Sequence, residues 1–330
     1  MLAECMKYRT VGGGAFSVSR IGVGGNIFGH FCSRAETARI LAVAADLGIN
    51  LVDTADAYSN GKSEEYIGAA LRGSRDKWII ATKAGLTSGA DPSGFASASS
   101  LRQKIEGSLA RLNTDYVDLY QVHHFDPKTP IEETIGTLAL LRAEGKIRSF
   151  GVSNYSGTAL RTAIVAANGQ GTNLVSVQCH YNLFSRSVER DLFPVCRAHG
   201  IVVLAYGVLA RGVLTGKYAR DCSPPAGSRA ETSASVQRDL APDVLDAVAR
   251  IVELAKSLGL NAGQVAVAWL LQREEVASAL VGVRHGLQLR QIADAVKVHL
   301  DEPHIQQLDA IAKRVSQSAD AGFGAPRVFG

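Results

Sequence analysis

The sequence contains few cysteines, and none is spaced to hold a metal ion or to form a redox pair. The five cysteines, at positions 5, 32, 179, 196 and 222, are scattered and include no CxxC pair, which argues against a zinc module and a disulfide framework. No stretch reaches the roughly 18 apolar residues of a membrane span, and the first twenty residues lack the apolar core of a signal peptide. We therefore expect reduced thiols, no membrane partner and a cytoplasmic location.

An excess of charge of one sign is also missing. Thirty-five Lys and Arg residues against 31 Asp and Glu residues give a net charge of +4, without a long basic run. This balance indicates neither a nucleic acid nor an anionic membrane as a partner, although it permits a small anionic ligand. Hydrophobic residues make up 46% of the chain and charged residues only 20%, so a largely disordered chain is excluded.

What the sequence does contain is a repeat of short apolar runs and amphipathic stretches closed by glycine. This alternation is typical of βαβ units in a parallel sheet, which places the chain in the α/β class. Eight parallel strands close most simply as a (β/α)8 TIM barrel, with an open doubly wound sheet as the alternative. No linker interrupts the pattern, so we expect one domain over residues 1–330. The predicted strands are residues 20–24, 51–54, 78–82, 116–122, 149–153, 174–179, 202–206 and 279–283.

Local signals mark the first elements. Ser33 followed three residues later by Glu36 predicts a capping box that opens a helix over residues 35–47, and Gly48 would end that helix in a left-handed conformation. Residues 8–19, with three glycines at their centre, predict a β-hairpin that precedes the first barrel strand and plugs one end of the barrel.

The last third of the chain predicts a loop and a helical extension. Residues 222–239 are rich in Ser, Pro, Ala and Arg without clear periodicity, which predicts a long surface loop. Helices are expected over residues 244–256 and 262–271, before the eighth strand. Pro303 is expected to open a final, C-terminal helix that reaches residue 314.

Ionisable residues fall at the carboxyl ends of predicted strands, which meet at one mouth of a TIM barrel. Asp53 ends the second strand and Tyr58 follows it, Lys83 ends the third, and His123 and His124 end the fourth. Taken singly, each has an ordinary structural interpretation, such as a turn cap or a hydrogen-bonded core histidine. Gathering them at one apolar mouth is costly unless they interact, so we favour a functional interpretation.

These residue types suit proton transfer. A free tyrosine, with a pKa of about 10, is a poor acid at neutral pH, but a nearby ammonium stabilises its phenolate. We expect Lys83 to lower the pKa of Tyr58 in this way, Asp53 to keep Lys83 charged, and His123 to donate a hydrogen bond to a substrate oxygen. The set fits protonation of a carbonyl oxygen coupled to attack on the carbonyl carbon.

A hydride source has to come from a cofactor, and the sequence has no GxGxxG motif between a strand and a helix, so a Rossmann site is not supported. At a barrel mouth, Ser153, Asn154 and Gln178 have side chains able to hold a carboxamide, and Tyr206 offers a flat face for stacking. On these grounds alone Asn154 is equally a turn residue and Tyr206 a core aromatic.

Basic and polar side chains near a predicted helix start could also meet a phosphate. They are Arg284, Gln288 and Arg290, which follow the eighth predicted strand. Helix N-termini and arginine forks both favour phosphate groups, although this signal has little weight without other evidence.

The chain resembles the aldo-keto reductase family over approximately residues 8–296. The segment GINLVDTADAYSNGKSEEYIG resembles the family's first signature, with Asp53 and Tyr58 in its catalytic places. IIATKAG resembles the lysine strand and carries Lys83, and DYVDLYQVHHFDP places His123 rather than His124 at the catalytic position. The resemblance therefore implies four catalytic residues on a TIM barrel.

The resemblance also implies a nicotinamide cofactor across the barrel mouth. GVSNY and VQCHYNLFSR resemble the segments that bind the carboxamide, and AYGVLARGVLTGKY resembles the segment that stacks on the nicotinamide and wraps the pyrophosphate. The cofactor residues that it implies are Ser153, Asn154, Gln178, Tyr206, Leu209, Arg211, Gly212, Lys217, Gly282, Val283, Arg284, Gln288 and Gln291.

Two departures from the family pattern concern this site. Gly207 and Val208 stand where relatives have Ser-Pro, and Gln291 and Ile292 stand where relatives have an acidic residue and an asparagine against the adenine. Arg284 and Gln288 occupy places that contact the 2′-phosphate in relatives, so the resemblance implies NADP(H), with NAD(H) still open.

The resemblance implies an oxidoreductase that transfers a hydride between nicotinamide and an aldehyde, ketone or alcohol, with Tyr58 as the general acid and no metal. Two alternatives remain: a lyase that forms a Schiff base on Lys83, and a nicotinamide-sensing regulatory subunit resembling potassium-channel β subunits. Loops over residues 27–31, 87–95, 125–129 and 222–239 are expected to shape the pocket. The sequence identifies neither the substrate, nor the physiological direction, nor the oligomeric state.

Overall fold

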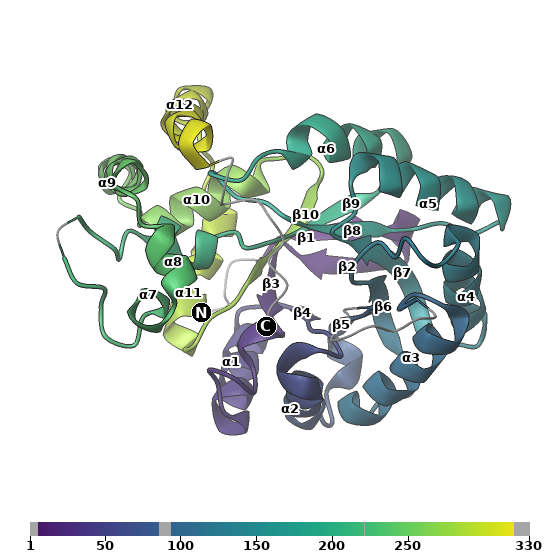
Figure 1. The fold of residues 1–330 in the computed structure, drawn as a ribbon. Helices are drawn as coiled ribbons and strands as arrows, with labels where there is room; N and C mark the ends of the chain where they lie inside the picture. Colours follow the sequence, from purple (N-terminus) through teal and green to yellow (C-terminus); the bar gives the residue numbers. More distant parts are fainter. Residues whose placement is uncertain (1–5, 86–93, 221, 320–330) are drawn as a thin grey trace.

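A computed structural model describes residues 6–85, 94–220 and 222–319, so the predicted loop over residues 87–95 lies largely outside the described residues. Eight parallel strands close into a barrel with helices around it (Figure 1), in the order β10-β3-β4-β5-β6-β7-β8-β9. The predicted TIM barrel is confirmed, and the open sheet is wrong. The strands are β3 (Ile21–Gly24), β4 (Leu51–Asp53), β5 (Ile79–Ala84), β6 (Val117–Val122), β7 (Ile147–Ser153), β8 (Ser176–His180), β9 (Val202–Tyr206) and β10 (Val276–Val281).

The eighth barrel strand, β10, begins three residues before its predicted start at residue 279 and ends before residue 283. The register between β10 and β9 shifts between Val276 and Ser278. Ser278 is a polar residue at this irregularity and interrupts the apolar run. The uninterrupted apolar run therefore starts only at residue 279, three residues after the strand begins.

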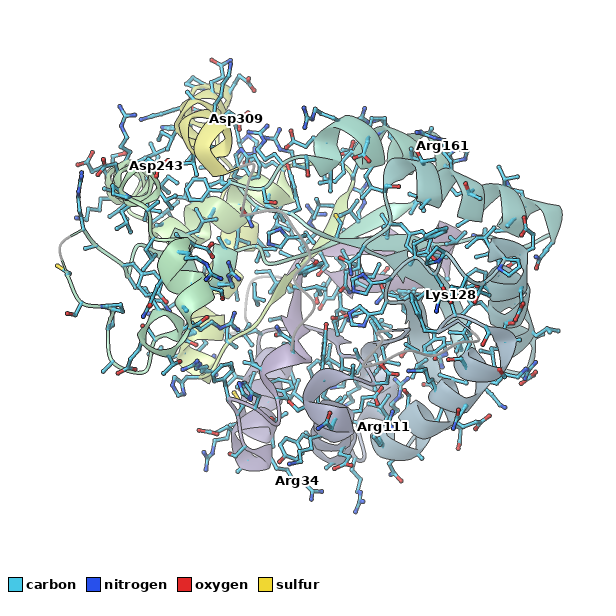
Figure 2. All side chains as sticks on the ribbon, in the orientation of Figure 1. Arg34, Arg111, Lys128, Arg161, Asp243 and Asp309 are labelled. Carbon is cyan, nitrogen blue, oxygen red and sulfur yellow. The ribbon has the colours of Figure 1, made fainter. Side chains whose placement is uncertain are left out.

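Helices cover the outside of the barrel, and their charged residues, such as Arg34, Arg161 and Asp243, are exposed (Figure 2). The capping box at Ser33 and Glu36 is present, and Gly48 follows the first helix with a φ of 73°. The helices are α1 (Arg34–Asp46), α2 (Lys62–Ala70), α3 (Ala98–Leu112), α4 (Ile131–Ala143), α5 (Gly157–Gly169), α6 (Val188–His199), α7 (Arg229–Thr232), α8 (Ala234–Arg238), α9 (Pro242–Ser257), α10 (Ala262–Leu271), α11 (Gly286–Ala293) and α12 (Glu302–Ala319).

The predicted hairpin forms from strands β1 (Tyr8–Val11) and β2 (Phe16–Ser19), which pair antiparallel across the three glycines. Val11 and Val18 are buried, and they pack with barrel residues such as Leu51 and Leu119 in one apolar cluster. This cluster fills the inside of the barrel, so the hairpin closes the amino-terminal end of the strands and leaves the carboxyl end as the mouth.

The predicted surface loop over residues 222–239 contains two short helices, α7 and α8, instead of being irregular throughout. Ala230 and Val236, one from each helix, are buried and anchor the segment. Both helices have five residues or fewer, which is too short for a helical period to appear in the sequence. The final helix α12 begins at Glu302 and extends beyond the predicted end at residue 314.

Three cysteines, Cys32, Cys179 and Cys196, are free and buried, and Cys222 is free and exposed. Cys5 lies outside the described residues. Within the described part of the chain, no helix is both long enough and apolar enough to cross a membrane.

Candidate active site

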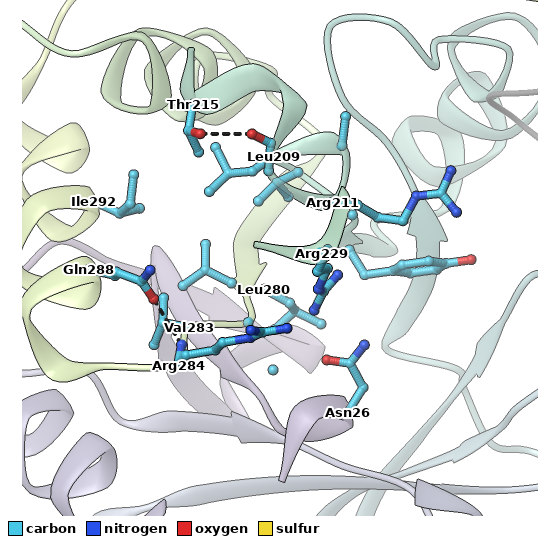
Figure 3. Close-up of a pocket in the computed structure, with 18 of the residues that line it drawn as sticks. Asn26, Leu209, Arg211, Thr215, Arg229, Leu280, Val283, Arg284, Gln288 and Ile292 are labelled. Atoms are coloured by element: carbon cyan, nitrogen blue, oxygen red, sulfur yellow. Dashed lines mark hydrogen bonds between the residues drawn. The ribbon is translucent and has the colours of Figure 1, made fainter. Parts of the chain in front are cut away.

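A pocket of about 920 Å³ opens at the carboxyl ends of the barrel strands. Its lining includes Asp53, Tyr58 and His123 as well as Arg284 and Gln288, and Figure 3 shows the part around Arg284 and Gln288. Of the catalytic and cofactor residues that the family resemblance implies, all line it except Lys83 and Ser153, whose side chains are fully buried. The structure therefore gathers the predicted residues around one continuous space.

A buried ion pair lies at the Tyr58 end of the pocket. β4 and β5 are neighbouring strands, and the Lys83 Nζ atom donates hydrogen bonds of 2.7 Å to Asp53 Oδ1 and to the Thr54 carbonyl oxygen. Burial lowers the pKa of Lys83, but the Asp53 carboxylate and the Tyr58 oxygen outweigh it, so the pKa ends above its ordinary value. Lys83 is therefore a fixed cation at neutral pH.

Tyr58 lies above this ion pair, at the start of a short 3-10 segment (Tyr58–Gly61) after β4. The Lys83 Nζ atom is 5.0 Å from the centre of its ring, close enough for the positive charge to favour the phenolate. Burial raises the pKa of Tyr58, and the opposing effect of Lys83 does not offset it, so the pKa lies above its ordinary value. The predicted lowering of this pKa is therefore wrong in its net sign, and Tyr58 keeps its proton.

His123 is buried beside Tyr58, with the two ring centres 5.9 Å apart and the rings nearly perpendicular. Burial, followed by the charge of Lys83, lowers the pKa of His123 to about 2. The imidazole is therefore neutral. Its Nδ1 atom has no hydrogen-bond partner among the residues that the structure describes, which leaves it free to bind a ligand. His124 stacks on His123, with 5.2 Å between ring centres.

Two glutamines also hold Asp53. Gln178 Nε2 donates a 2.7 Å hydrogen bond to Asp53 Oδ2, and Gln121 Nε2 donates a longer one of 3.4 Å. The contact of Gln178 with Asp53 was not predicted, and it uses one of the two N–H groups of the Gln178 amide. Gln121 was missed altogether, although a glutamine inside an otherwise apolar strand run is a signal for a buried polar contact.

The other predicted carboxamide residues form a hydrogen-bonded group. Asn154 Nδ2 donates to the His123 carbonyl oxygen at 3.0 Å and to Ser153 Oγ at 3.1 Å, and Asn154 Oδ1 accepts a 2.8 Å hydrogen bond from Tyr206. Asn154 also has a φ of 59°, so its interpretation as a turn residue is correct as well. The group fixes the Tyr206 ring at the pocket wall.

Cations surround the other end of the pocket. Arg211 pairs with Asp239, and the Arg284 side chain donates to the Gly227 carbonyl oxygen. Gly212 has a φ of 98°, a backbone conformation that residues with a side chain rarely adopt, so glycine is favoured in this turn. Such a set of donors, with bare backbone between them, is suited to phosphate groups.

Arg229, on α7, lines the pocket although no pattern in the sequence predicted it (Figure 3). Burial, followed by the charge of Arg284, lowers its pKa, and within the described residues it forms no ion pair with a carboxylate. Arg229 lies in residues 222–239, which were predicted only as a surface loop, and its one indication in the sequence was its positive charge. Arg290, by contrast, is exposed and pairs with Asp46 at 3.4 Å, so its predicted role near a phosphate is not supported.

The chain is similar to known proteins over nearly its whole length. A model described as the Aldo/keto reductase family matches residues 20–313. The solved structure of the glycerol dehydrogenase AKR11B4 from Gluconobacter oxydans is 33% identical, with a TM-score of 0.81, and the match covers 96% of this chain and 97% of that one.

Two further relatives are named for different functions. An NADH-specific methylglyoxal reductase from Escherichia coli (strain K12) is 33% identical over 77% of this chain and 81% of its own. A probable voltage-gated potassium channel subunit beta from Arabidopsis thaliana is 32% identical over 89% of this chain and 92% of its own. The family model, the identities and the shared barrel agree, and the chain belongs to the aldo/keto reductase family, a family of oxidoreductases that use nicotinamide cofactors.

Proposed function

We propose that this protein is an NADP(H)-dependent oxidoreductase that interconverts an aldehyde or ketone and the matching alcohol, with Tyr58 as the general acid and base. The observation that carries the proposal is the Asp53, Lys83 and Tyr58 array at one end of a pocket whose other end is lined by arginines. A proton donor and a phosphate site in one space fit a carbonyl substrate beside a dinucleotide.

The residues present fit such a cofactor. The backbones of Gly24 and Gly282 lie close together at the pocket floor, where a Cβ atom on Gly282 would lie 3.8 Å from the Gly24 carbonyl oxygen. In our proposal Gln178, with Ser153 and Asn154 behind it, holds the carboxamide, and Tyr206 offers its ring face. The pyrophosphate end is assigned to Leu209, Arg211, Gly212 and Lys217, and the adenosine end to Gly282, Val283, Arg284, Gln288 and Gln291.

A bound reduced nicotinamide supplies a hydride to the carbonyl carbon. Tyr58 gives its phenolic proton to the carbonyl oxygen, and the Lys83 ammonium stabilises the phenolate left behind. Asp53 keeps Lys83 charged and in place, and neutral His123 donates one N–H to the same substrate oxygen. In the oxidising direction the Tyr58 phenolate accepts the alcohol proton, so one site serves both directions.

The preference for NADP(H) rests on the arginines. Arg284 stacks on Phe31, with its Cζ atom 4.2 Å from the ring centre, and Arg229 lies 5.9 Å from the same ring. Two guanidiniums close together favour a dianionic 2′-phosphate, which they can bind as forks. The relative named as an NADH-specific reductase makes a direct comparison of both cofactors necessary.

The lyase alternative has little support. The Lys83 side chain is fully buried and paired with Asp53, and a charged, paired amine is not the free nucleophile that a Schiff base needs. The regulatory alternative is kept because one relative is named as a potassium channel subunit beta. It predicts tight cofactor binding with negligible turnover and a stable protein partner.

The test is a panel of carbonyls and alcohols followed at the nicotinamide absorbance, with NADP(H) and NAD(H) in parallel. Tyr58→Phe should abolish turnover while it leaves cofactor binding intact. Tyr8→Phe is a matched control, because the Tyr8 hydroxyl bonds Gly48 on the outside of the barrel. Near-normal turnover in Tyr58→Phe with normal cofactor binding would refute the role of Tyr58, and tight binding without turnover across the panel would favour the regulatory subunit.

A further inference from the structure

A histidine with no assigned role stands in the pocket wall between the two parts of the cofactor site. His180 is the last residue of β8 and lies beside Tyr206 of β9 in the barrel register. The centres of the two rings are 5.4 Å apart, and His180 lines the pocket. It therefore lies beside Tyr206, assigned to the nicotinamide, and its ring faces Gly207, the next residue along the chain.

One nitrogen of His180 is held by its own loop, and the other is not. His180 Nδ1 lies 3.1 Å from the Oγ atom of Ser185, which is buried in the turn after β8. Among the described residues, no hydrogen-bond partner meets His180 Nε2. When the Ser185 hydroxyl donates to Nδ1, the proton of the neutral ring is on Nε2, and the ring presents an N–H donor.

The position of this nitrogen explains why residue 207 has no side chain. A Cβ atom on Gly207 would lie 2.5 Å from His180 Nε2, so the imidazole fills the space that a side chain there would take. The same turn after β8 also holds Gly207 in place, because Asn182 Nδ2 donates a 2.9 Å hydrogen bond to its carbonyl oxygen. Gly207 has no side chain at this point of the pocket wall, so the imidazole of His180 is the polar side chain there.

The surroundings of His180 favour an oxygen acceptor. Burial, followed by the charge of Arg211, lowers the pKa of His180 to about 4, so the ring is neutral, and it presents an Nε2–H donor when Ser185 donates to Nδ1. Tyr206 and Asn182 already use their polar atoms on Asn154 and Gly207. The N–H group of His180 therefore has no acceptor in the part of the pocket wall that the structure describes. A ribose–phosphate group suits this position, because all its polar atoms are oxygens that can accept a hydrogen bond.

We propose that His180 is a cofactor-binding residue whose Nε2–H donates a hydrogen bond to a ribose or phosphate oxygen in the nicotinamide half of the dinucleotide. This assignment rests on the proposed function, because it requires a dinucleotide in the pocket. It assigns His180 no contact with the adenosine half.

The test measures binding directly, by titrating the wild-type protein and its variants with NADPH, or with NADH if that binds more tightly. His180→Ala should weaken binding about 3- to 10-fold, which is the range for one lost hydrogen bond. His180→Gln, which can place an amide N–H near the Nε2 position, should restore most of the affinity. Adenosine 2′,5′-bisphosphate, or 5′-AMP for an NADH enzyme, should bind all three proteins equally and so shows that the variants are folded.

Three results would overturn the assignment. They are an unchanged dinucleotide affinity in His180→Ala, an equal loss for the adenosine fragment, and a His180→Gln variant as weak as His180→Ala, which would reveal a packing role. Failure of the wild-type protein to bind either dinucleotide would remove the proposed function itself. If the wild-type protein binds a dinucleotide but the His180 variants do not behave as predicted, only the role of His180 is refuted. The two failures are therefore distinguishable.

Discussion

The Lys83 ammonium and the Asp53 carboxylate form a 2.7 Å ion pair in which the lysine side chain is fully buried and the aspartate side chain is 5% exposed. Removing water from both groups is unfavourable, and close contact with further hydrogen bonds compensates for it. Here Thr54 accepts from the lysine and Gln178 donates to the aspartate. The pair is therefore one unit in which neither charge is stable without the other.

Asp53→Asn should consequently damage both stability and activity. It removes the countercharge of the buried Lys83 ammonium, and breaking such a pair typically destabilises a protein by about 3–5 kcal/mol. It also favours loss of the Lys83 proton, and a neutral Lys83 no longer stabilises the Tyr58 phenolate, so kcat should fall by about 100-fold or more. Urea unfolding and steady-state kinetics measure the two effects. The control is Asp246→Asn, whose exposed pair with Arg220 should change neither. A fully active Asp53→Asn variant would contradict the assigned role.

The raised pKa of Tyr58 predicts the pH dependence of each direction. With Tyr58 as the proposed general acid, reduction requires the protonated phenol, so its kcat should stay flat through neutral pH and fall only in strongly alkaline solution, where the phenol ionises. Oxidation needs the phenolate, so its kcat should rise with pH over the same range. Profiles of kcat in both directions check this relation. A reduction rate that falls with an apparent pKa near 7 would show that another group donates the proton.

His123 links stability to pH. Its pKa is about 2 in the folded protein and about 6.5 in the unfolded chain, so the unfolded state binds a proton in acid that the folded state does not. The contribution of His123 to the free energy of unfolding is therefore complete well above pH 6.5, and it is lost as the pH falls towards 2. Between pH 6.5 and pH 5 the loss is about 2 kcal/mol. The free energy of unfolding, measured with urea at pH 7, 6 and 5, should fall less steeply with decreasing pH in His123→Asn than in the wild-type protein. The exposed control His299→Gln should show the same dependence on pH as the wild-type protein.

The barrel and the four proposed catalytic residues were predictable because both follow from short-range regularities. Strand and helix periods define the eight units, and the ends of parallel strands must meet at one mouth. Asp53, Lys83 and His123 are the last strand residues or their immediate neighbours in the sequence. Their gathering therefore required no knowledge of side-chain packing.

Burial depth and side-chain partners were not predictable, because they depend on how the closed barrel packs. The net pKa of Tyr58 is decided by its burial, which no local pattern records. Gln178 reaches Asp53 across the barrel, from a residue 125 positions away in the chain. Arg229 enters the pocket because α7 is anchored by Ala230, and a four-residue helix is too short to show a period.

Gly207→Ala tests the contact of this glycine with His180. Gly207 has a φ of 68°, which destabilises an alanine there by about 1 kcal/mol, and the new Cβ atom also collides with the imidazole. We expect a 5-fold or greater loss of dinucleotide affinity, on the order of 1 kcal/mol, measured by fluorescence titration. Gly171→Ala is the matched control, since its φ is 63° but its Cβ atom would meet open space. Equal affinities in the two variants would contradict the contact.

Arg229 and Arg284 should decide between the two cofactors. If both guanidiniums bind a 2′-phosphate, Arg229→Gln and Arg284→Gln should each raise the Kd for NADPH by about 10-fold, since one charged hydrogen bond is worth about 1.5–3 kcal/mol. The Kd for NADH should hardly change, because NADH lacks that phosphate. Titration of each variant with both cofactors gives the ratio of the Kd for NADPH to the Kd for NADH directly.

Arg290→Gln provides the control for these substitutions, because Arg290 is exposed and lies outside the pocket. A loss of affinity for NADPH and NADH alike in Arg229→Gln would place this arginine at the pyrophosphate, which both cofactors share. Salt separates the cases further: a dianionic group held by two partly buried arginines should lose affinity with ionic strength more steeply for NADPH than for NADH. Parallel salt dependences for the two cofactors would argue against a 2′-phosphate site between Arg229 and Arg284.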